Sequence, residues 1–254
     1  MVQESKTRFA SNLVVILDHP AQAGNVGAVA RAMGNMGFAR LRLVAPRQFP
    51  HPDADAFAVG NKEILQNAEL FDDVASAVAD IHYLVATTNR HRGQRQIVLT
   101  PRELGVVLLE HSVHPERLTG ILFGTERTGL LTSDVERARV ICHIPTVDGQ
   151  GSLNLAQAVL IVLYEIMLGQ GQGQTMAHDP FQEDVLASVG DMDRLFQHME
   201  ETLTTIEFIK PEQNRHMMGS LKAIFHRAGL NRREVAILRG IWHEVIAFRD
   251  RGRQ

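Results

Sequence analysis

The sequence LVVILDHPAQAGNVGAVARAMGNM, residues 13–36, joins a continuous apolar run to a segment with helical spacing through a short polar loop. The run Leu13–Leu17 is short, β-branched and bounded by polar residues, which is typical of a buried strand. Apolar residues at helical spacing from Val26 to Met36 then predict a helix. A buried strand followed directly by a helix is the repeating unit of an α/β protein.

The same alternation of strand and helix continues along the next hundred residues. Further strand-like runs are Leu41–Ala45, Tyr83–Ala86, Gly120–Phe123 and Val140–Ile144. Segments with helical spacing are Phe71–Ala79, Pro101–Glu110 and Thr132–Ala138. We therefore expect an α/β fold with a parallel sheet that is covered on both faces.

The last predicted helix of this part, Leu153–Leu168, is apolar on nearly every side, so we expect it to be buried in the core or in a subunit interface. It ends at an alternating Gly/Gln stretch, which is typical of a flexible linker. Beyond Pro180 the pattern is purely helical. We predict a first domain over residues 1–168, a linker over 169–180 and a small all-α domain over 181–254.

Composition excludes several classes of protein. The chain has 254 residues, of which 44% are hydrophobic, so it is neither disordered nor a miniature disulfide scaffold. Cys142 is the single cysteine, which excludes an internal disulfide and fits a reducing compartment. No apolar run reaches the roughly 18 residues of a membrane span, and the start lacks a signal-peptide core. We expect a cytoplasmic protein that binds neither membrane nor DNA.

The charge is unevenly distributed along the chain. The formal net charge is -3, so a polyanion would have to be held by a local patch. From Phe208 onward, ten Lys and Arg residues stand against four Asp and Glu residues, a net charge of +6. This tail is either a solvated helical face or an RNA-binding surface.

Gly24-Asn25 directly precedes the first predicted helix, and Arg31 lies six residues after Asn25. Glycine permits a tight turn and lets a ligand approach the backbone amides at a helix N-terminus. The second strand ends in Val44-Ala45 without an acidic residue for a ribose, which disfavours a classical dehydrogenase. Arg31 lies among Ala and Met residues and is either a solvated charge or an anion contact.

Two further polar clusters follow strands. Gly124–Gly129 comes after the fourth predicted strand, at the kind of sheet edge where α/β proteins usually bind ligands. Its Glu126 and Arg127 either contact a ligand or only tie down the loop. Ser152 and Asn154 precede the apolar helix: Ser152 is a natural N-cap, whereas the Asn154 amide in the first turn needs partners or a ligand.

The remaining polar residues give weaker signals. Arg90 and Arg92 belong to a basic loop that either contacts phosphate or is solvated. The histidines form no His-x-x-x-His pattern with an acidic companion, so we expect no metal site. We interpret His82, His143 and His226 as local structural residues.

Taken together, the three clusters, in this order and each at a strand end, resemble the three motifs of the SpoU/TrmH branch of the SPOUT methyltransferases. Residues 10–168 are similar to the knotted domain of that branch, and residues 221–241 are similar to the helical extension of its TrmJ tRNA methyltransferase family. The resemblance implies a parallel sheet with a C-terminal trefoil knot, an obligate homodimer, and S-adenosylmethionine bound in the knot loops.

The motif match also implies roles for individual residues. Catalytic positions would be Asn25, Arg31, Glu126, Ser152 and Asn154, with Arg31 as the catalytic arginine. Cofactor-binding positions would be Thr87, Thr88, Gly124, Glu126, Ile144, Leu153 and Asn154. RNA contacts would come from Arg31, Arg90, Arg92 and Arg127.

The implied reaction transfers a methyl group from S-adenosylmethionine to a ribose 2'-hydroxyl of tRNA. Arg31 would stabilise the negative charge that develops on the hydroxyl oxygen, because a guanidinium stays protonated. Cytidine or uridine 32 in the anticodon loop is the leading target. Ala21–Ala23 and Thr125 depart from the usual residues beside the expected RNA site. Another tRNA position, ribosomal RNA, and an RNA-binding protein without catalysis therefore stay open as alternatives.

Overall fold

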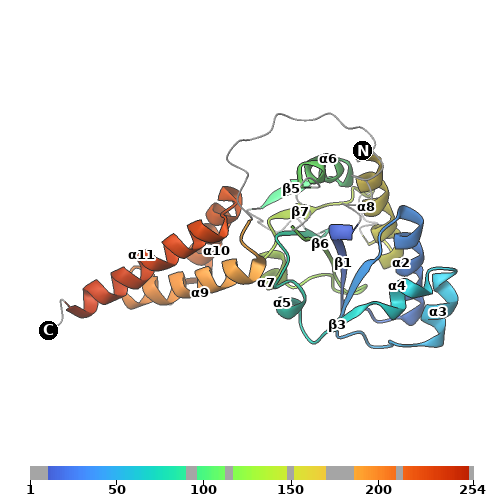
Figure 1. Cartoon of the computed structure of the whole chain (residues 1–254), viewed down its shortest axis with the longest axis horizontal. Helices are drawn as coiled ribbons and strands as arrows, with labels where there is room; N and C mark the ends of the chain where they lie inside the picture. Colours follow the sequence, from blue (N-terminus) through green and yellow to red (C-terminus); the bar gives the residue numbers. More distant parts are fainter. Residues whose placement is uncertain are drawn as a thin grey trace.

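The computed structural model describes residues 11–89, 96–111, 117–147, 152–169, 186–209 and 214–251. Within them, seven parallel strands form one sheet in the order β3-β2-β1-β6-β4-β7-β5 (Figure 1). This confirms the predicted α/β class and the parallel sheet. The strands are β1 Leu13–Asp18, β2 Arg40–Val44, β3 Glu69–Phe71, β4 Tyr83–Thr87, β5 Ile97–Leu99, β6 Thr119–Phe123 and β7 Val140–Cys142.

Strand β1 lies between β2 and β6, and every one of its residues is buried. Val15 is paired with Leu41 on one side and with Ile121 on the other. A strand that is covered on both faces must be apolar along its whole length, which explains the run Leu13–Leu17.

Helices cover both faces of the sheet. Leu13, Val15 and Leu17 face a core formed with α2, α3, α4, α6 and α8. Val14 and Ile16 face a second core formed with α5 and α7. These helices are α2 Ala23–Met36, α3 Pro52–Ala58, α4 Lys62–Gln66, α5 Val74–Ala77, α6 Pro101–His111, α7 Thr132–Val135 and α8 Leu155–Gly169.

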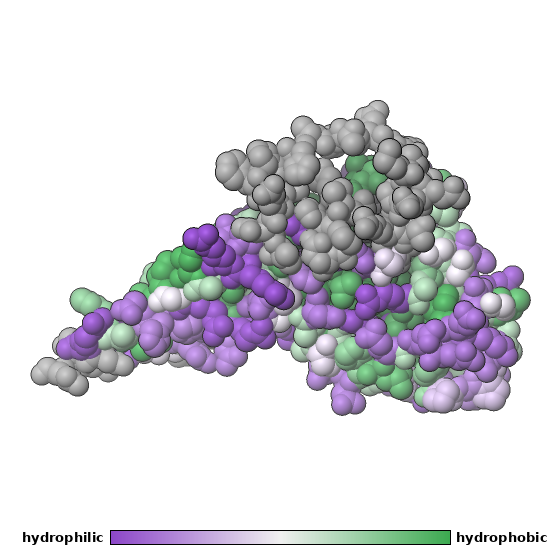
Figure 2. All heavy atoms as spheres, viewed as in Figure 1, coloured by the Kyte–Doolittle hydropathy of each residue, from purple (hydrophilic) through white to green (hydrophobic). Residues whose placement is uncertain are grey.

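Three helices project from the sheet as an arm, which comprises α9 Val189–Thr205, α10 Asn214–Ala228 and α11 Arg232–Arg251 (Figure 1). A separate apolar cluster that includes Leu195, Phe196 and Met199 holds them together. The face of the arm in Figure 2 is mostly hydrophilic, with one hydrophobic patch.

The base of the arm is fastened to the sheet layer by backbone hydrogen bonds. Val189 N–H donates to the Ile81 carbonyl at 2.8 Å, and Gly190 N–H donates to the Ala79 carbonyl at 3.1 Å. Asp193 of α9 forms an ion pair with Arg137. The start of α9 therefore has a fixed position at the end of α5.

Some predicted boundaries are wrong. Helix α5 covers only Val74–Ala77, because Phe71 belongs to the edge strand β3. Strand β7 ends at Cys142 rather than Ile144, and helix α7 ends at Val135 rather than Ala138. Helices α3 and α4 and the edge strands β3 and β5 were not predicted.

Helix α8 is apolar on both its inner and its outer faces. Its inner residues, which include Val159, Val162 and Ile166, are fully buried. Large outer side chains, which include Leu160 and Tyr164, are exposed in the single chain. The prediction of burial is therefore confirmed for the inner face of α8, and burial of the outer face in a subunit interface stays a prediction. None of the helices in the described ranges has the length and apolar character needed to cross a bilayer.

Candidate active site

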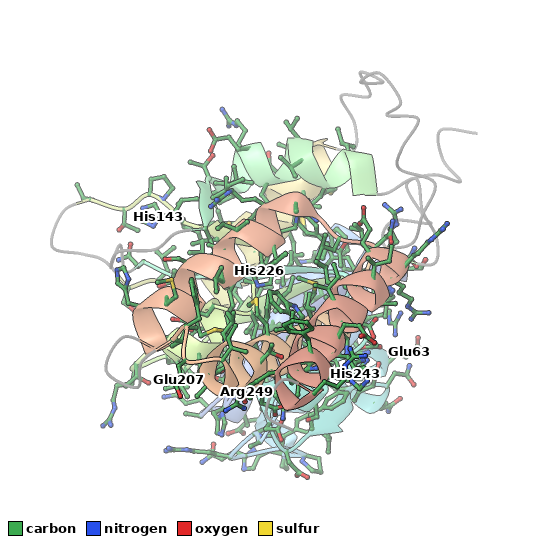
Figure 3. The ribbon with its side chains drawn as sticks, turned by 90° about the vertical axis from the view of Figure 1, so that its left-hand side faces the viewer. Glu63, His143, Glu207, His226, His243 and Arg249 are labelled. Carbon is green, nitrogen blue, oxygen red and sulfur yellow. The ribbon has the colours of Figure 1, made fainter. Side chains whose placement is uncertain are left out.

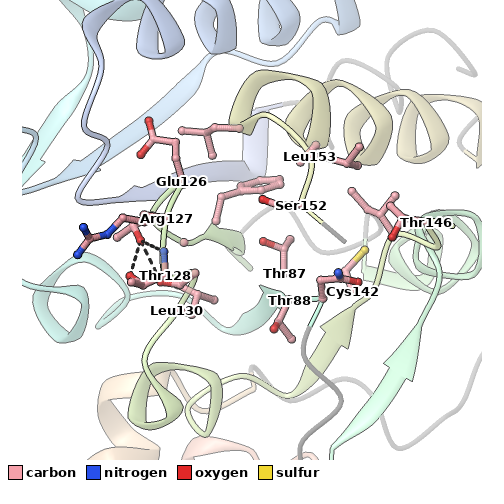
Figure 4. Close-up of a pocket in the computed structure, with 18 residues that line it drawn as sticks. Thr87, Thr88, Glu126, Arg127, Thr128, Leu130, Cys142, Thr146, Ser152 and Leu153 are labelled. Carbon is pink, nitrogen blue, oxygen red and sulfur yellow. Dashed lines mark hydrogen bonds between the residues drawn. The ribbon is translucent and has the colours of Figure 1, made fainter. Parts of the chain in front are cut away.

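A cleft of about 250 Å³ opens at the carboxyl ends of β4, β6 and β7, close to the start of α8 (Figure 4). Polar residues of the β6–α7 loop line one side, and apolar residues around α8 line the other. The lining comprises Thr87, Thr88, Asn89, Phe123, Gly124, Thr125, Glu126, Arg127, Thr128, Gly129, Leu130, Cys142, Ile144, Thr146, Ser152, Leu153, Leu155 and Ala158.

A chain of hydrogen bonds joins the three sequence clusters beside this cleft. Asn25 Nδ2 donates to Glu126 Oε1 at 3.0 Å. Asn154 Nδ2 donates to Asn25 Oδ1, also at 3.0 Å. The Glu126 carboxylate further accepts from Ala21 N–H, with N–O distances of 3.2 and 3.3 Å. Because β1 and β6 are neighbours in the sheet, residues about a hundred positions apart are tied into one unit.

Asn154 has a second role at the start of α8. Its Oδ1 accepts from Ala156 N–H at 2.9 Å, and its carbonyl accepts from Ala158 N–H at 3.0 Å. Asn154 therefore caps the helix, so the prediction of Ser152 as the N-cap is wrong. Ser152 instead lies exposed at the cleft, and Asn154 precedes the first turn rather than lying within it.

Gly124 is required by a close approach of backbone to backbone. A Cβ at this position would lie 2.4 Å from both the carbonyl carbon of Gly129 and the nitrogen of Leu130. The loop closes on itself there, because Gly129 N–H donates to the Thr125 carbonyl at 3.0 Å. The result is a tight backbone wall along one side of the cleft.

The opposite side of the loop is braced by β4 and β7. Thr87 Oγ1 donates to the Leu122 carbonyl at 3.0 Å, and Thr88 N–H donates to the Cys142 carbonyl at 3.2 Å. Cys142 is buried, as predicted, and also lines the cleft; burial raises the pKa of its thiol to about 12. The thiol is therefore protonated near neutral pH and is no nucleophile there.

The predicted cofactor residues gather in one place. Six of the seven line the cleft: Thr87, Thr88, Gly124, Glu126, Ile144 and Leu153. Asn154 is linked to it indirectly, because it donates to Asn25, which in turn donates to the lining residue Glu126. Sequence reasoning missed Thr146 and Asn89, although both directly follow predicted strands or motif residues and could have been found from that position.

The arginines differ in their placement. Arg31 is exposed on α2 and forms no hydrogen bond or ion pair with any residue in the described ranges. Arg127 lines the rim of the cleft, and its guanidinium points away from the centre (Figure 4). Arg90 and Arg92 lie outside the described residues.

The three histidines have different surroundings. His226 lies among the arm helices (Figure 3), and His143 Nδ1 lies 3.4 Å from the carbonyl oxygen of Thr88. Burial lowers the pKa of His226 to about 4, and burial also lowers the pKa of His82. His82 Nδ1 accepts from Leu118 N–H at 3.1 Å, which is a structural contact. Among the described residues, no cluster of His, Cys, Asp or Glu could hold a metal ion.

Comparison with known families gives two matches. Residues 12–164 match the SpoU rRNA Methylase family, and residues 190–254 match the C-terminal domain of the tRNA methyltransferase TrmJ. The chain is 35% identical over 238 residues to the tRNA (cytidine/uridine/adenosine-2'-O-)-methyltransferase TrmJ of Pseudomonas aeruginosa (strain UCBPP-PA14), covering 91% of this chain and 92% of the relative.

Solved structures agree with these matches. TrmJ from Z. mobilis ZM4 superposes with a TM-score of 0.78 at 35% identity, covering 91% of this chain and 98% of that one. A probable methylase family protein from Haemophilus influenzae Rd KW20 superposes with a TM-score of 0.61 at 29% identity, covering 95% and 98%. The resemblance seen in the three sequence clusters is confirmed, and the chain belongs to the SpoU methylase family.

Proposed function

We propose that this protein is an S-adenosylmethionine-dependent methyltransferase that acts on a ribose 2'-hydroxyl of tRNA. The observation that carries the proposal is the chain of hydrogen bonds Glu126–Asn25–Asn154. It joins all three motif clusters at the edge of one cleft. The P. aeruginosa relative, which matches over most of both chains, is named for this reaction.

The residues of the cleft fit S-adenosylmethionine. The backbone of the loop packs against Gly124 where a Cβ would stand, so main-chain groups rather than a side chain line the cleft there. Ile144 and Leu153 supply apolar surface for an adenine ring, and Thr87 and Thr88 supply polar groups. The volume is near the lower end of small-molecule pockets, which begin at roughly 300 Å³. When bound, the cofactor supplies the methyl group.

The protein orients the hydroxyl and stabilises its charge. A free ribose hydroxyl is a weak nucleophile near neutral pH, so alignment and charge stabilisation both matter. Arg31 has no partner in the described ranges, which leaves its guanidinium available for the developing oxyanion. Asn25, one and a half turns earlier on α2, fixes the start of that helix through Glu126 and Asn154. Ser152 lies at the cleft beside these residues.

Membership of the family supports finer proposals. The target is nucleotide 32 of the anticodon loop, with Arg90, Arg92 and Arg127 contacting RNA. Residues 1–168 form a domain closed by a trefoil knot, and residues 181–254 form an all-α domain that binds RNA; of the linker predicted over residues 169–180, only Gly169 lies in the described ranges. The protein works in the cytoplasm.

The outer face of α8 supports a homodimer. Leu160, Ile161, Tyr164 and Leu168 form an apolar surface on this helix, and each keeps 36–45% of its surface exposed in the single chain. Burial of such a surface against a second copy removes it from water. The dimer also allows Arg31 of one subunit to act beside cofactor held mainly by the other.

The test is transfer of labelled methyl from S-adenosylmethionine to unmodified total tRNA, followed by nuclease digestion and nucleoside mass spectrometry. We expect one ribose-methylated nucleoside that Arg31→Ala abolishes while cofactor binding is retained. Arg40→Ala, at the opposite end of the sheet, is the matched arginine control and should stay active. An Arg31→Ala protein that transfers methyl at the normal rate would refute the assigned role.

A further inference from the structure

The connection from β2 to α3, residues 45–51, runs beside the start of α2. Arg47 N–H donates to the Pro20 carbonyl at 3.2 Å, and Gln48 Oε1 accepts from Ala23 N–H at 3.5 Å. On the other side, α3 packs directly on α2: a Cβ at Gly27 would lie 2.1 Å from the Ala54 carbonyl oxygen. The loop 45–51 and helix α3 therefore both hold the start of α2, which carries Asn25.

Phe57 of α3 lies over this helix start and yet faces solvent. Its Cδ2 and Cε2 atoms are 3.5 Å from the position of a Cβ on Gly24. Its Cβ is 2.9 Å from the position of a Cβ on Gly27. The side chain nevertheless keeps 56% of its surface exposed. Contact with the two glycines restricts the ring, and a restricted, exposed ring loses little entropy when a ligand stacks on it.

Two exposed arginines lie on the segments that meet at the start of α2. Arg47 and Arg31 are both exposed, and neither forms a hydrogen bond or ion pair through its side chain with the residues in the described ranges. Arg31 lies one turn after Gly27, on the side of α2 that Phe57 contacts. The acid one turn before Phe57, Asp53, lies 3.6 Å from His51 Nδ1. An exposed aromatic with two unpaired arginines on the adjoining segments suits a single-stranded polyanion with flat bases.

We propose that Phe57 is a stacking platform for an unpaired base of the RNA substrate and that Arg47 contacts an adjoining phosphate. The inference rests on the proposed function and extends it by naming a substrate-positioning surface outside the cofactor cleft. A base stacked on Phe57 would hold its neighbour's ribose near Asn25 and Arg31. Stacking has little sequence preference, so this surface contributes affinity and position rather than base identity.

The experiment compares Phe57→Ala, Phe57→Leu and Phe57→Tyr in the full chain. Three quantities are measured: Kd for an unmodified anticodon stem-loop RNA, KM for that RNA, and Kd for S-adenosylmethionine. Because base–aromatic stacking is worth about 1–3 kcal/mol, Phe57→Ala should weaken RNA binding about five- to 150-fold. Phe57→Leu keeps the packing on Gly24 without a π face and should behave like Phe57→Ala, whereas Phe57→Tyr should resemble the wild type.

Leu70→Ala is the matched control, because Leu70 is equally exposed, at 57%, on the edge strand β3. It should leave all three quantities unchanged. Arg47→Ala should lower the slope of log Kd against log salt by about 0.7–0.9, the value for one phosphate contact. Phe57→Ala and Arg47→Ala should both leave Kd for S-adenosylmethionine unchanged.

Several outcomes would overturn the proposal. These are unchanged RNA affinity in Phe57→Ala, equal affinity of the Leu and Tyr variants, or a parallel loss of cofactor affinity that shows a packing role. RNA binding is read directly, so it decides the matter even in a protein that transfers no methyl group. Absence of transfer in the wild type would instead refute the proposed function.

Discussion

Replacement of Gly124 by alanine tests whether the backbone wall of the cleft matters. The added Cβ would lie 2.4 Å from atoms of Gly129 and Leu130, whereas ordinary contact begins at 3.4 Å, so the two ends of the loop must separate by about 1 Å. Overpacking of this kind costs about 1–3 kcal/mol. The separation also strains at least two of the hydrogen bonds that close the loop at Thr125, those from Gly129 N–H and Thr128 N–H, each worth about 0.5–1.5 kcal/mol.

The sum, about 2–6 kcal/mol, must appear in one of two measurements. If the loop stays closed, the free energy of unfolding in urea falls by that amount. If the loop opens instead, stability is kept and the dissociation constant for S-adenosylmethionine rises about 30- to 25,000-fold in titration calorimetry. Gly240→Ala is the control, because a Cβ there meets no atom within 4 Å. In the middle of α11 it should stabilise the protein by about 0.5–1 kcal/mol.

A Gly124→Ala protein with wild-type stability and wild-type cofactor affinity would refute this reasoning. That result would mean that the loop can move aside to admit a Cβ, contrary to what its backbone contacts at Gly129 and Leu130 indicate. Loss of stability in both glycine variants would point to a general effect of substitution rather than to the cleft.

Three further predictions concern single side chains. Asn154→Asp keeps the cap on α8 but loses the donor to Asn25, so methyl transfer should fall while urea stability stays within about 0.5 kcal/mol; Asn154→Ala should also lose about 1 kcal/mol of stability. Arg42 is 3% exposed and holds Asp80 with two hydrogen bonds, which lower the pKa of that carboxyl. Arg42→Met should cost about 2–4 kcal/mol at neutral pH, and the difference in urea stability should narrow as pH falls through the acid range, because Asp80 then protonates in both proteins. His226 has a pKa of about 4 in the folded protein, below its unfolded value, so the wild type should lose up to about 3 kcal/mol between pH 6.5 and 4. His226→Gln should show a flatter pH profile of thermal unfolding over that range.

Each has a result that would contradict it. Equal transfer by Asn154→Asp and wild type would mean that the link to Asn25 is dispensable. If the difference in urea stability between Arg42→Met and wild type stays constant down to pH 3, the ion pair with Asp80 does not cause it. Parallel acid profiles for His226→Gln and wild type would show that another group titrates there.

The central strands and the long helices could be predicted from the sequence because their signal is local. Leu13–Leu17 is buried on both faces, and its apolar run shows this directly. The edge strands β3 and β5 have three residues each, and most of those residues are exposed. Strand β5 is apolar throughout, but three residues are fewer than the roughly four to eight that predict a strand. Helix α3 begins at Pro52 behind a cap from His51, a weaker signal than Ser, Thr, Asp or Asn.

The candidate site was predicted as residues but not as contacts. The motif match named Glu126, Asn25 and Asn154, yet their hydrogen bonds depend on β1 lying beside β6, which no local pattern reveals. The exchange of roles between Ser152 and Asn154 has the same origin. Ser and Asn are about equally good caps by residue type, so residue type alone does not choose between Ser152 and Asn154. In the fold, Asn154 stands at the helix end and also donates to Asn25.

The sheet order also determines how long β1 lacks its second neighbouring strand while the chain is being synthesised. Strand β1 can pair with β2 soon after both emerge, but its other edge is completed only by β6, from Leu13 opposite Thr119 to Leu17 opposite Phe123. A ribosome that adds about 5–20 residues per second needs roughly 5–20 s to supply those intervening residues. During that interval an apolar β-branched strand has one open edge, the feature that favours mispairing with other chains. Strand β1, which lies in the interior of the folded sheet, is therefore the segment that most needs chaperone protection while the protein is made.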